Sequence, residues 1–345
     1  MNRLNVKGFS IIEFMIAISL GALLIASAAS IYLSGKRTFN SQYGLARLQE
    51  NARYANFRIN QDIRMAGFLG CGNQNSVEIT NRIKNPSQIL SSTQPIKGYD
   101  ATNGSFSPSL PSNLSANALA GSDVLEIRMG SSEDALLSSN MNLTNNPIAV
   151  HDRLTINAGD ILMISNCQVG DVFVAGSNSN SVVITHAANE NTSNDLSVAY
   201  TTDANVMKYL YYAYYVKNTG RTNASNEPIL ALMRQDVSGN EDEIAEGVEQ
   251  MQVRYGVDTN SDRAADQYQT ATEVEAGNNW DNVISVNMRL LFATTGNVST
   301  EAQPYTFNGT TTTPSDTKLR REWNSFITLR NRGLPGSPLL AGAAE

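Results

Sequence analysis

The chain opens with two successive hydrophobic patterns. Residues 9–33 form an almost uninterrupted apolar run, which is long enough to cross a bilayer as a helix at about 1.5 Å per residue. Residues 34–67 repeat apolar side chains at three- and four-residue steps, the period of one helical face. These are Leu45, Leu48, Ala52, Ala55, Ile59, Ile63 and Ala66. Gly67 is well placed to end the helix in a left-handed cap, so one helix from about Phe9 to Ala66 is predicted.

Residues 68–345 have the pattern of a β-rich body with long loops. Runs of β-branched and aromatic residues alternate with clusters of Asn, Gly, Ser and Pro, as strands alternate with turns. The predicted strands cover residues 124–129, 161–165, 172–175, 182–186, 206–216, 229–234, 251–255 and 283–293. Residues 73–120 and 187–203 are predicted to be polar surface loops. The expected fold class is α+β: a long helix, transmembrane and then amphipathic, packed on a β-rich domain.

Three segments of the body carry more detailed expectations. In residues 283–293, apolar side chains at every second position from Val286 to Phe292 predict a strand with one buried face. Tyrosines on both faces of residues 209–215 predict a central strand whose hydroxyls reach polar partners, and a stacking surface for a ligand is the alternative. Residues 241–246 are predicted to form a solvated acidic turn.

Composition narrows the classes of function. The net charge of -7 disfavours nucleic-acid binding by the whole surface, because phosphate binding needs a basic face. The two histidines, His151 and His186, lie far apart, and no HExxH or CxxC spacing is present. Zinc and iron–sulfur chemistry therefore have few ligands. Since no nucleophile elbow or phosphate loop is found either, the sequence predicts a protein that is not an enzyme and needs no cofactor.

The N-terminus sets the orientation of the predicted membrane helix. Residues 1–8 form a short polar leader with the basic residues Arg3 and Lys7. By the positive-inside rule these residues stay in the cytoplasm, so the body lies in the periplasm of a single-pass inner-membrane protein. Two alternatives are a secretory signal cut within the small-residue stretch 26–30 and a plain signal anchor.

Neither alternative explains Glu13. A carboxylate within an apolar span costs about 2.5–3.5 kcal/mol on insertion scales, so such a residue usually has a functional partner. Glu13 is the fifth residue of a chain that begins at Phe9. A cut after Gly8 would create a positive amine at Phe9, and that amine on one subunit could neutralise Glu13 on its neighbour in a fibre.

The stretch Lys7-Gly8-Phe9-Ser10-Ile11-Ile12-Glu13 resembles the class III prepilin cleavage motif. The resemblance implies cleavage between Gly8 and Phe9 by prepilin peptidase, N-methylation of Phe9, and a role for Glu13 in subunit assembly. Major type IVa pilins have a proline where this chain has Ser30. The helix is therefore expected to lack their kink, and a role as the bulk subunit is disfavoured.

A second resemblance lies in the body. Residues 247–258, GVEQMQVRYGVD, resemble the matching segment of PilW-type pilus assembly proteins, as do residues 64–68 and 329–332. The J minor pseudopilin of type II secretion shares the pattern more loosely. The resemblance implies a minor pilin in a priming complex near the fibre tip, used in twitching motility, adhesion or DNA uptake. The implied partners are other minor pilins, the major pilin, prepilin peptidase, the inner-membrane assembly platform and a tip adhesin.

Two further candidate sites come from the residues themselves. Cys71 and Cys167 can form a disulfide bond in an oxidising periplasm, and two buried free thiols are the alternative. Asp258, Asn260, Asp262 and Asp266 lie in an oxygen-rich loop that partly resembles a calcium-binding loop. Arg263 and Gln269 depart from that pattern, and a solvated turn with Asx caps is the alternative.

Two other functions compete with pilus assembly. A type II secretion pseudopilin is also structural but serves protein export. A pilus-borne adhesin or DNA-binding module would need an exposed patch on residues 73–120, where Arg82, Lys84 and Lys97 supply the positive charge.

Overall fold

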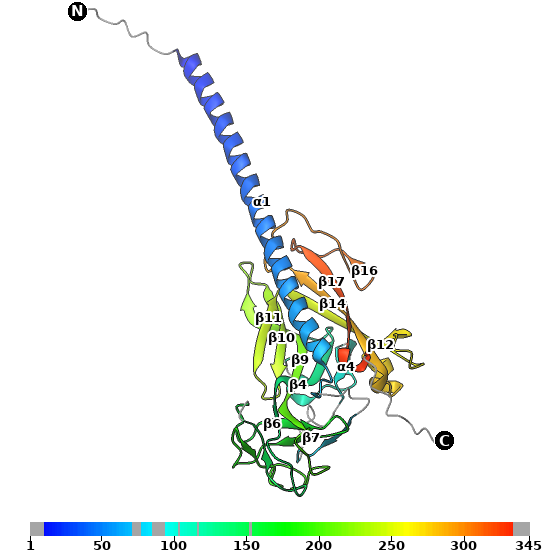
Figure 1. Ribbon diagram of the computed structural model, residues 1–345. Helices are drawn as coiled ribbons and strands as arrows, with labels where there is room; N and C mark the ends of the chain where they lie inside the picture. Colours follow the sequence, from blue (N-terminus) through cyan, green and yellow to red (C-terminus); the bar gives the residue numbers. More distant parts are fainter. Residues whose placement is uncertain are drawn as a thin grey trace, which may run out of the picture.

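A computed structural model describes residues 10–70, 77–84, 94–102, 104–115, 117–151 and 154–333. Its longest element is helix α1 (Ile11–Met65). Its first half projects from the body as a rod, and its second half lies across the body (Figure 1). The helix runs without a break past Ser30, and Gly67 follows it with a φ of 70°. The predicted continuous helix is confirmed, and Gly67 has the predicted left-handed backbone. Its N–H donates to the Arg128 carbonyl, however, and the Phe68 N–H donates to the Met65 carbonyl, so the helix ends in a β-turn and not in a left-handed helix cap.

The two halves of α1 differ in burial as their patterns predict. Side chains from Leu48 to Ile63 at helical spacing are 0–5% exposed and belong to the main core of the body. The most apolar window of the helix has a mean hydropathy of 2.2 and is not buried at all. The second half therefore attaches to the body, while the first half presents its apolar surface outward.

The larger sheet is built around β9 (Asn205–Thr222), which pairs along its length with β6, β4 and β10. The strand order is β1-β7-β6-β9-β4-β2-β3, with β10 and β11 continuing from β9. All the pairs are antiparallel except β1 with β7. The other strands are β1 (Glu78–Asn81), β2 (Ile96–Thr102), β3 (Ser105–Ser107), β4 (Val124–Leu136), β6 (Ile161–Ser165), β7 (Val169–Val174), β10 (Pro228–Asp236) and β11 (Glu241–Glu246).

The smaller sheet has the order β13-β12-β14-β17 and is antiparallel throughout. Its strands are β12 (Val248–Val257), β13 (Gln267–Gln269), β14 (Val283–Ala293) and β17 (Arg320–Thr328). Alternate side chains of β12 and β14 join α1 in the main core. The short elements beside this sheet are α3 (Ala271–Ala276), η1 (Trp280–Asn282), β15 (Tyr305–Phe307), β16 (Thr310–Thr312) and α4 (Arg330–Gly333).

A lobe with its own core lies at the end of the body far from the projecting half of α1 (Figure 1). This lobe joins part of the larger sheet to the two-stranded pair β5 (Ile148–Ala149) and β8 (Val183–Ile184). Its core is centred on Leu162, Phe173 and Tyr200, each fully buried. The short helix α2 (Ser112–Ser115) lies elsewhere, against a third core with Tyr99 and Tyr211.

The strand predictions are confirmed in part. The 283–293 strand has the predicted bounds, and the tyrosine-rich strand is central, with the Tyr211 hydroxyl bonded to Glu126 at 2.7 Å. The prediction of one buried face for residues 283–293 is wrong, because ten of the eleven residues of β14 are buried. β14 is paired with β12 on one side and β17 on the other, which helps to bury the side chains of its second face as well.

Two loop predictions are wrong. Residues 73–120 contain β2, whose Ile96 and Tyr99 are buried against the sheets. Residues 241–246 form strand β11, not a solvated turn, because Ile244 and Ala245 face the core while the acidic side chains point to cations. In both segments tertiary pairing outweighs a polar local composition.

Candidate assembly site

Glu13 lies at the first turn of α1, where it closes a capping box. The Ser10 N–H donates to Glu13 Oε2 at 2.9 Å, and the Ile12 N–H donates to Ser10 Oγ at 3.3 Å. Within the described part of the chain, no cation pairs with Glu13. One carboxylate oxygen thus caps the helix of its own chain, and the other is open to a second molecule. Gly8 and Phe9, the predicted cleavage residues, lie outside the described residues.

The exposed half of α1 surrounds Glu13 with apolar side chains. Ile11, Ile12, Phe14 and Met15 are 62–79% exposed, and large apolar residues continue along the helix to Leu33. From Ile11 to Leu33 the helix spans about 34 Å at 1.5 Å per residue, slightly more than a bilayer core. Such an apolar surface is shielded from water only by lipid or by other apolar helices. This is what a membrane-anchored protein requires.

A buried polar cluster anchors the second half of α1 to the larger sheet. Asp62, 6% exposed, accepts a hydrogen bond from the Tyr214 hydroxyl at 2.5 Å and lies 3.3 Å from Arg234. Arg234 also pairs with Asp242 at 2.7 Å and lies over the Tyr212 ring at 4.3 Å. Burial and the nearby Asp62 charge raise the pKa of Tyr214, so its hydroxyl stays a donor. The cluster fixes the rotation of α1 on β9 and β10.

A narrow groove runs beside α1 where the helix leaves the body. It encloses about 220 Å³ between helix residues 40–51 and loop residues 293–298, with Glu246 at one side. Gly44 permits the close approach, since a Cβ atom there would lie 3.2 Å from both Thr294 and Val298. Across the groove entrance, Arg47 pairs with Glu246 at 2.5 Å. Because Arg47 is half-exposed, this ion pair contributes little stability and serves mainly to orient the helix.

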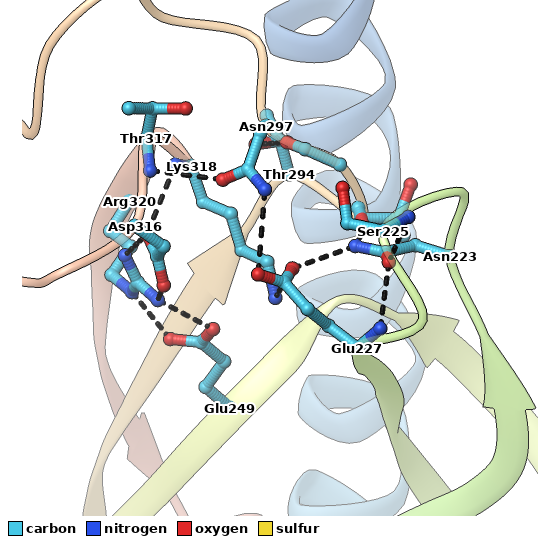
Figure 2. A network of polar contacts seen from close by, with 12 residues as sticks. Asn223, Ser225, Glu227, Glu249, Thr294, Asn297, Asp316, Thr317, Lys318 and Arg320 are labelled. Carbon is cyan, nitrogen blue, oxygen red and sulfur yellow. Dashed lines mark hydrogen bonds and ion pairs between the residues drawn. The ribbon is translucent and has the colours of Figure 1, made fainter.

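The loop that forms one wall of this groove is held by the polar network of Figure 2. Glu227 accepts from Asn223 at 2.8 Å, accepts from Asn297 at 3.4 Å, and pairs with Lys318 at 3.2 Å. Arg320, 8% exposed, pairs with Glu249 at 2.6 Å and Asp316 at 2.7 Å. The hydrogen bond from Arg320 lowers the pKa of Asp316, so the carboxylate remains charged. The network ties residues 294–319 to both sheets.

Three stretches that are far apart in the sequence meet where α1 ends. Asn331 donates to the carbonyls of Met65 and Ala66 at 3.3 and 3.1 Å, so α4 satisfies the end of α1. Ala66 and Leu329 share the main core with the β12 segment 251–257. Residues 64–68, 247–258 and 329–332, which carry the resemblance in the body, thus form one unit around the helix end. Asp62, which lies near this helix end, and Arg320, which lies in the network of Figure 2, had no local sequence signal.

Comparisons with known families agree with this arrangement. Residues 213–331 match the family model described as Type IV Pilus-assembly protein W, and residues 3–29 match the prokaryotic N-terminal methylation motif. Over these two segments the chain resembles the PilW family of type IV pilus proteins. No curated protein and no solved structure shows a significant match. The PilW match spans β12, β14 and β17 together with the Figure 2 network, while the far lobe lies outside it.

The family gives the chain a place among the structural components of a type IV pilus. It implies contacts with other pilus components, and the apolar helix with its prepilin motif implies membrane anchoring. The predicted fold class and family are therefore confirmed.

Only one of the two cysteines predicted to pair lies within the described structure, because Cys71 lies outside the described residues. Cys167 lies in the turn between β6 and β7, with a φ of 72°. Gly70 directly precedes Cys71, and a Cβ atom on Gly70 would lie 3.7 Å from the Asn205 side chain. Asn205 is the strand partner of Ser165, two residues before Cys167. The chain next to Cys71 thus passes near the turn that holds Cys167, and the disulfide bond stays a prediction.

The predicted calcium loop has its oxygens directed to its own backbone. Asp258 accepts from the N–H groups of Asn260, Ser261 and Arg263, and Asp266 accepts from Thr259. Among the described residues, no group of three or more His, Cys, Asp or Glu side chains is placed to hold a metal ion. This is the arrangement of the Asx-capped turn, and calcium binding stays a prediction.

The basic residues proposed for an adhesive or DNA-binding patch are engaged within the body. Arg82 pairs with the buried Asp171 at 2.7 Å, and Lys97 lies 3.5 Å from Glu275. Lys84 donates to the Ala188 carbonyl at 3.5 Å. These contacts make the three residues part of the fold and leave little free charge for such a patch.

Proposed function

We propose that the chain is a minor pilin of the complex that primes type IV pilus assembly near the fibre tip. Prepilin peptidase cuts between Gly8 and Phe9 in this proposal, and Phe9 is then methylated. The mature protein waits in the inner membrane with its body in the periplasm, until α1 enters the growing fibre. Its partners are the other minor pilins, the major pilin, the inner-membrane assembly platform and a tip adhesin.

The observation that carries this proposal is Glu13 in the exposed apolar half of α1. An unpaired carboxylate in an apolar layer costs about 2.5–3.5 kcal/mol at its centre. Pairing with the Phe9 amine of a neighbouring subunit removes that cost and fixes the axial register between the helices. Glu13 caps its own helix with one oxygen, so the other can take the neighbour's amine without loss of the cap.

The capping box allows the charge of Glu13 to be separated from its capping role. Glu13→Gln keeps a side chain that can cap the helix but removes the charge. Ser10→Ala removes one capping hydrogen bond and keeps the charge, and Glu13→Ala removes both functions. We expect all three variants to insert into the membrane, and only Ser10→Ala to enter fibres at the wild-type level.

The measurement is the amount of protein in membranes and in sheared fibres, compared by immunoblot. Loss of both glutamate variants from fibres, with Ser10→Ala retained, would support charge pairing. Wild-type incorporation of Glu13→Gln would show that the charge has no role, and the proposed assembly mechanism would then be wrong.

A further inference from the structure

The outer face of the smaller sheet, opposite α1, holds a polar pocket of about 290 Å³. Its floor is formed by β12 and β14, and its walls by the end of β2, the start of α3 and the turn between β15 and β16. The polar groups that the argument uses are Asp123, Gln252, Arg254, Asn287, Arg289 and Asn308. A pocket of this size accommodates one small ring with a few waters, not a large ligand.

Strand register brings the two guanidinium groups of the pocket to one face. Gln252 is paired with Arg289, and Arg254 is paired with Asn287. Side chains of directly paired residues share a face of the sheet, so Arg254 and Arg289 are diagonal neighbours with Cβ atoms about 7–8 Å apart. The two cations flank the floor of the pocket.

The acidic groups of the pocket are already satisfied. Asp123, 3% exposed, accepts from the backbone N–H groups of Ala101 and Val253 at 2.9 Å, and from Gln252 at 3.2 Å. Asp100 accepts from the N–H groups of Ala271 and Thr272 at the start of α3.

The basic groups differ from each other in their partners. Arg289 pairs with Glu322 at 3.1 Å. Arg254, in contrast, makes no hydrogen bond or ion pair with the part of the chain that the structure describes. The charge left open in the pocket is therefore a guanidinium, whose planar fork of donors matches a carboxylate with two parallel hydrogen bonds.

Two exposed aromatic rings lie beside the pocket on the same face of the sheet. Phe326, 65% exposed, is the strand partner of Asn287, and Tyr268, 37% exposed, is the partner of Gly256. The rings meet edge to face with their centroids 5.6 Å apart. Gly256 makes room for them, since a Cβ atom there would lie 3.1 Å from the Tyr268 ring and 2.1 Å from Ser285 Oγ.

We propose that this pocket binds a hexuronate unit of an acidic polysaccharide. The sugar carboxylate pairs with Arg254, its hydroxyls bond to the amides of Gln252 and Asn308, and its apolar face packs on Phe326. A free guanidinium beside amides and an exposed ring is a combination that a sugar acid satisfies fully, whereas an acidic peptide side chain uses only the guanidinium. This binding function is separate from assembly through α1, so either proposal can fail without the other.

Titration of the full-length chain in detergent micelles with digalacturonate, followed by calorimetry, tests the proposal. We expect a dissociation constant in the millimolar range or tighter for the wild type. Arg254→Gln should weaken binding by about tenfold or more, because it removes a hydrogen bond between charged groups. Arg254 has no partner to lose in the described body, so this variant should fold normally, as near-ultraviolet circular dichroism will show.

Arg321→Gln is the matched control, since Arg321 is an exposed arginine on β17 outside the pocket. It should bind digalacturonate as the wild type does, and Phe326→Ser should bind it more weakly. The proposal is overturned if digalacturonate does not bind at about 10 mM, which is above the expected dissociation constant. It is also overturned if Arg254→Gln binds normally, or if digalactose or N-acetylglutamate binds as well as digalacturonate.

Discussion

Tyr214→Phe tests whether the buried cluster at Asp62 holds α1 on the body. The substitution removes one hydroxyl from a ring that is fully buried, so it leaves the packing of the ring unchanged. The lost bond is the 2.5 Å contact with the Asp62 carboxylate. A hydrogen bond to a charged group contributes about 1.5–3 kcal/mol, and we expect the free energy of unfolding to fall by that amount.

The rest of the cluster sets the limits of this estimate. Asp62 keeps Arg234 at 3.3 Å in Tyr214→Phe, so its charge is not left without a partner. In Asp62→Ala, Arg234 keeps Asp242, but the Tyr214 hydroxyl loses its acceptor. The double variant should therefore cost less than the sum of the single variants, with a coupling energy of about 1.5–3 kcal/mol.

Urea unfolding of the full-length chain in micelles gives these free energies. Trp280 is a suitable fluorescent reporter, because it is 6% exposed and its ring centroid lies 5.0 Å from that of Tyr255 in the main core. Tyr54→Phe on the exposed face of α1 is the control and should change stability by less than about 0.5 kcal/mol. If Tyr214→Phe behaves like Tyr54→Phe, the cluster does not hold the helix and the reasoning is refuted.

Three other predictions concern the body. Gly247→Ala should lower the free energy of unfolding by about 2 kcal/mol or more, because Gly247 has a φ of 78° and a Cβ atom there would lie 2.4 Å from the Ala293 carbonyl oxygen. Gly296→Ala is the control, since a Cβ atom at Gly296 meets open space. Equal urea midpoints for the two variants would contradict this prediction. Burial raises the pKa of Asp123 from 3.8 to about 7, against opposing backbone hydrogen bonds, so its contribution to stability is full below pH 3.8 and is lost as the pH rises to 7. Stability should thus fall less between pH 5 and pH 8 in Asp123→Asn than in the wild type, and an unchanged pH dependence would exclude Asp123 as its source. Mass spectrometry of the non-reduced, digested protein should yield a peptide pair joined through Cys71 and Cys167, and free thiols at both residues would remove the predicted disulfide bond.

The sequence alone predicts an element correctly where the pattern that defines it lies within one continuous segment. The apolar run, the 3.6-residue period and Gly67 together define α1, and the β-branched core of β14 defines its exact bounds. The leader, Phe9 and Glu13 identify the class of protein without any tertiary information.

The missed elements depend on partners that are distant in the sequence. β17 reads RREWNSFIT, with three charged residues at its start. It is paired on one side only, and its polar side chains reach α1 and Asp316 in the loop of residues 294–319. β11 is acidic because its carboxylates face Arg47, Lys217 and Arg221 from other elements. Asp62 looks like any exposed helix acid until Tyr214, 152 residues later, is placed beside it.

The start of the mature chain tests the central claim most directly. Intact mass and N-terminal sequencing of the protein recovered from sheared fibres should show an N-methylated phenylalanine, Phe9, as the first residue. A chain in the fibre that begins at Met1, or within residues 26–30, would contradict the account.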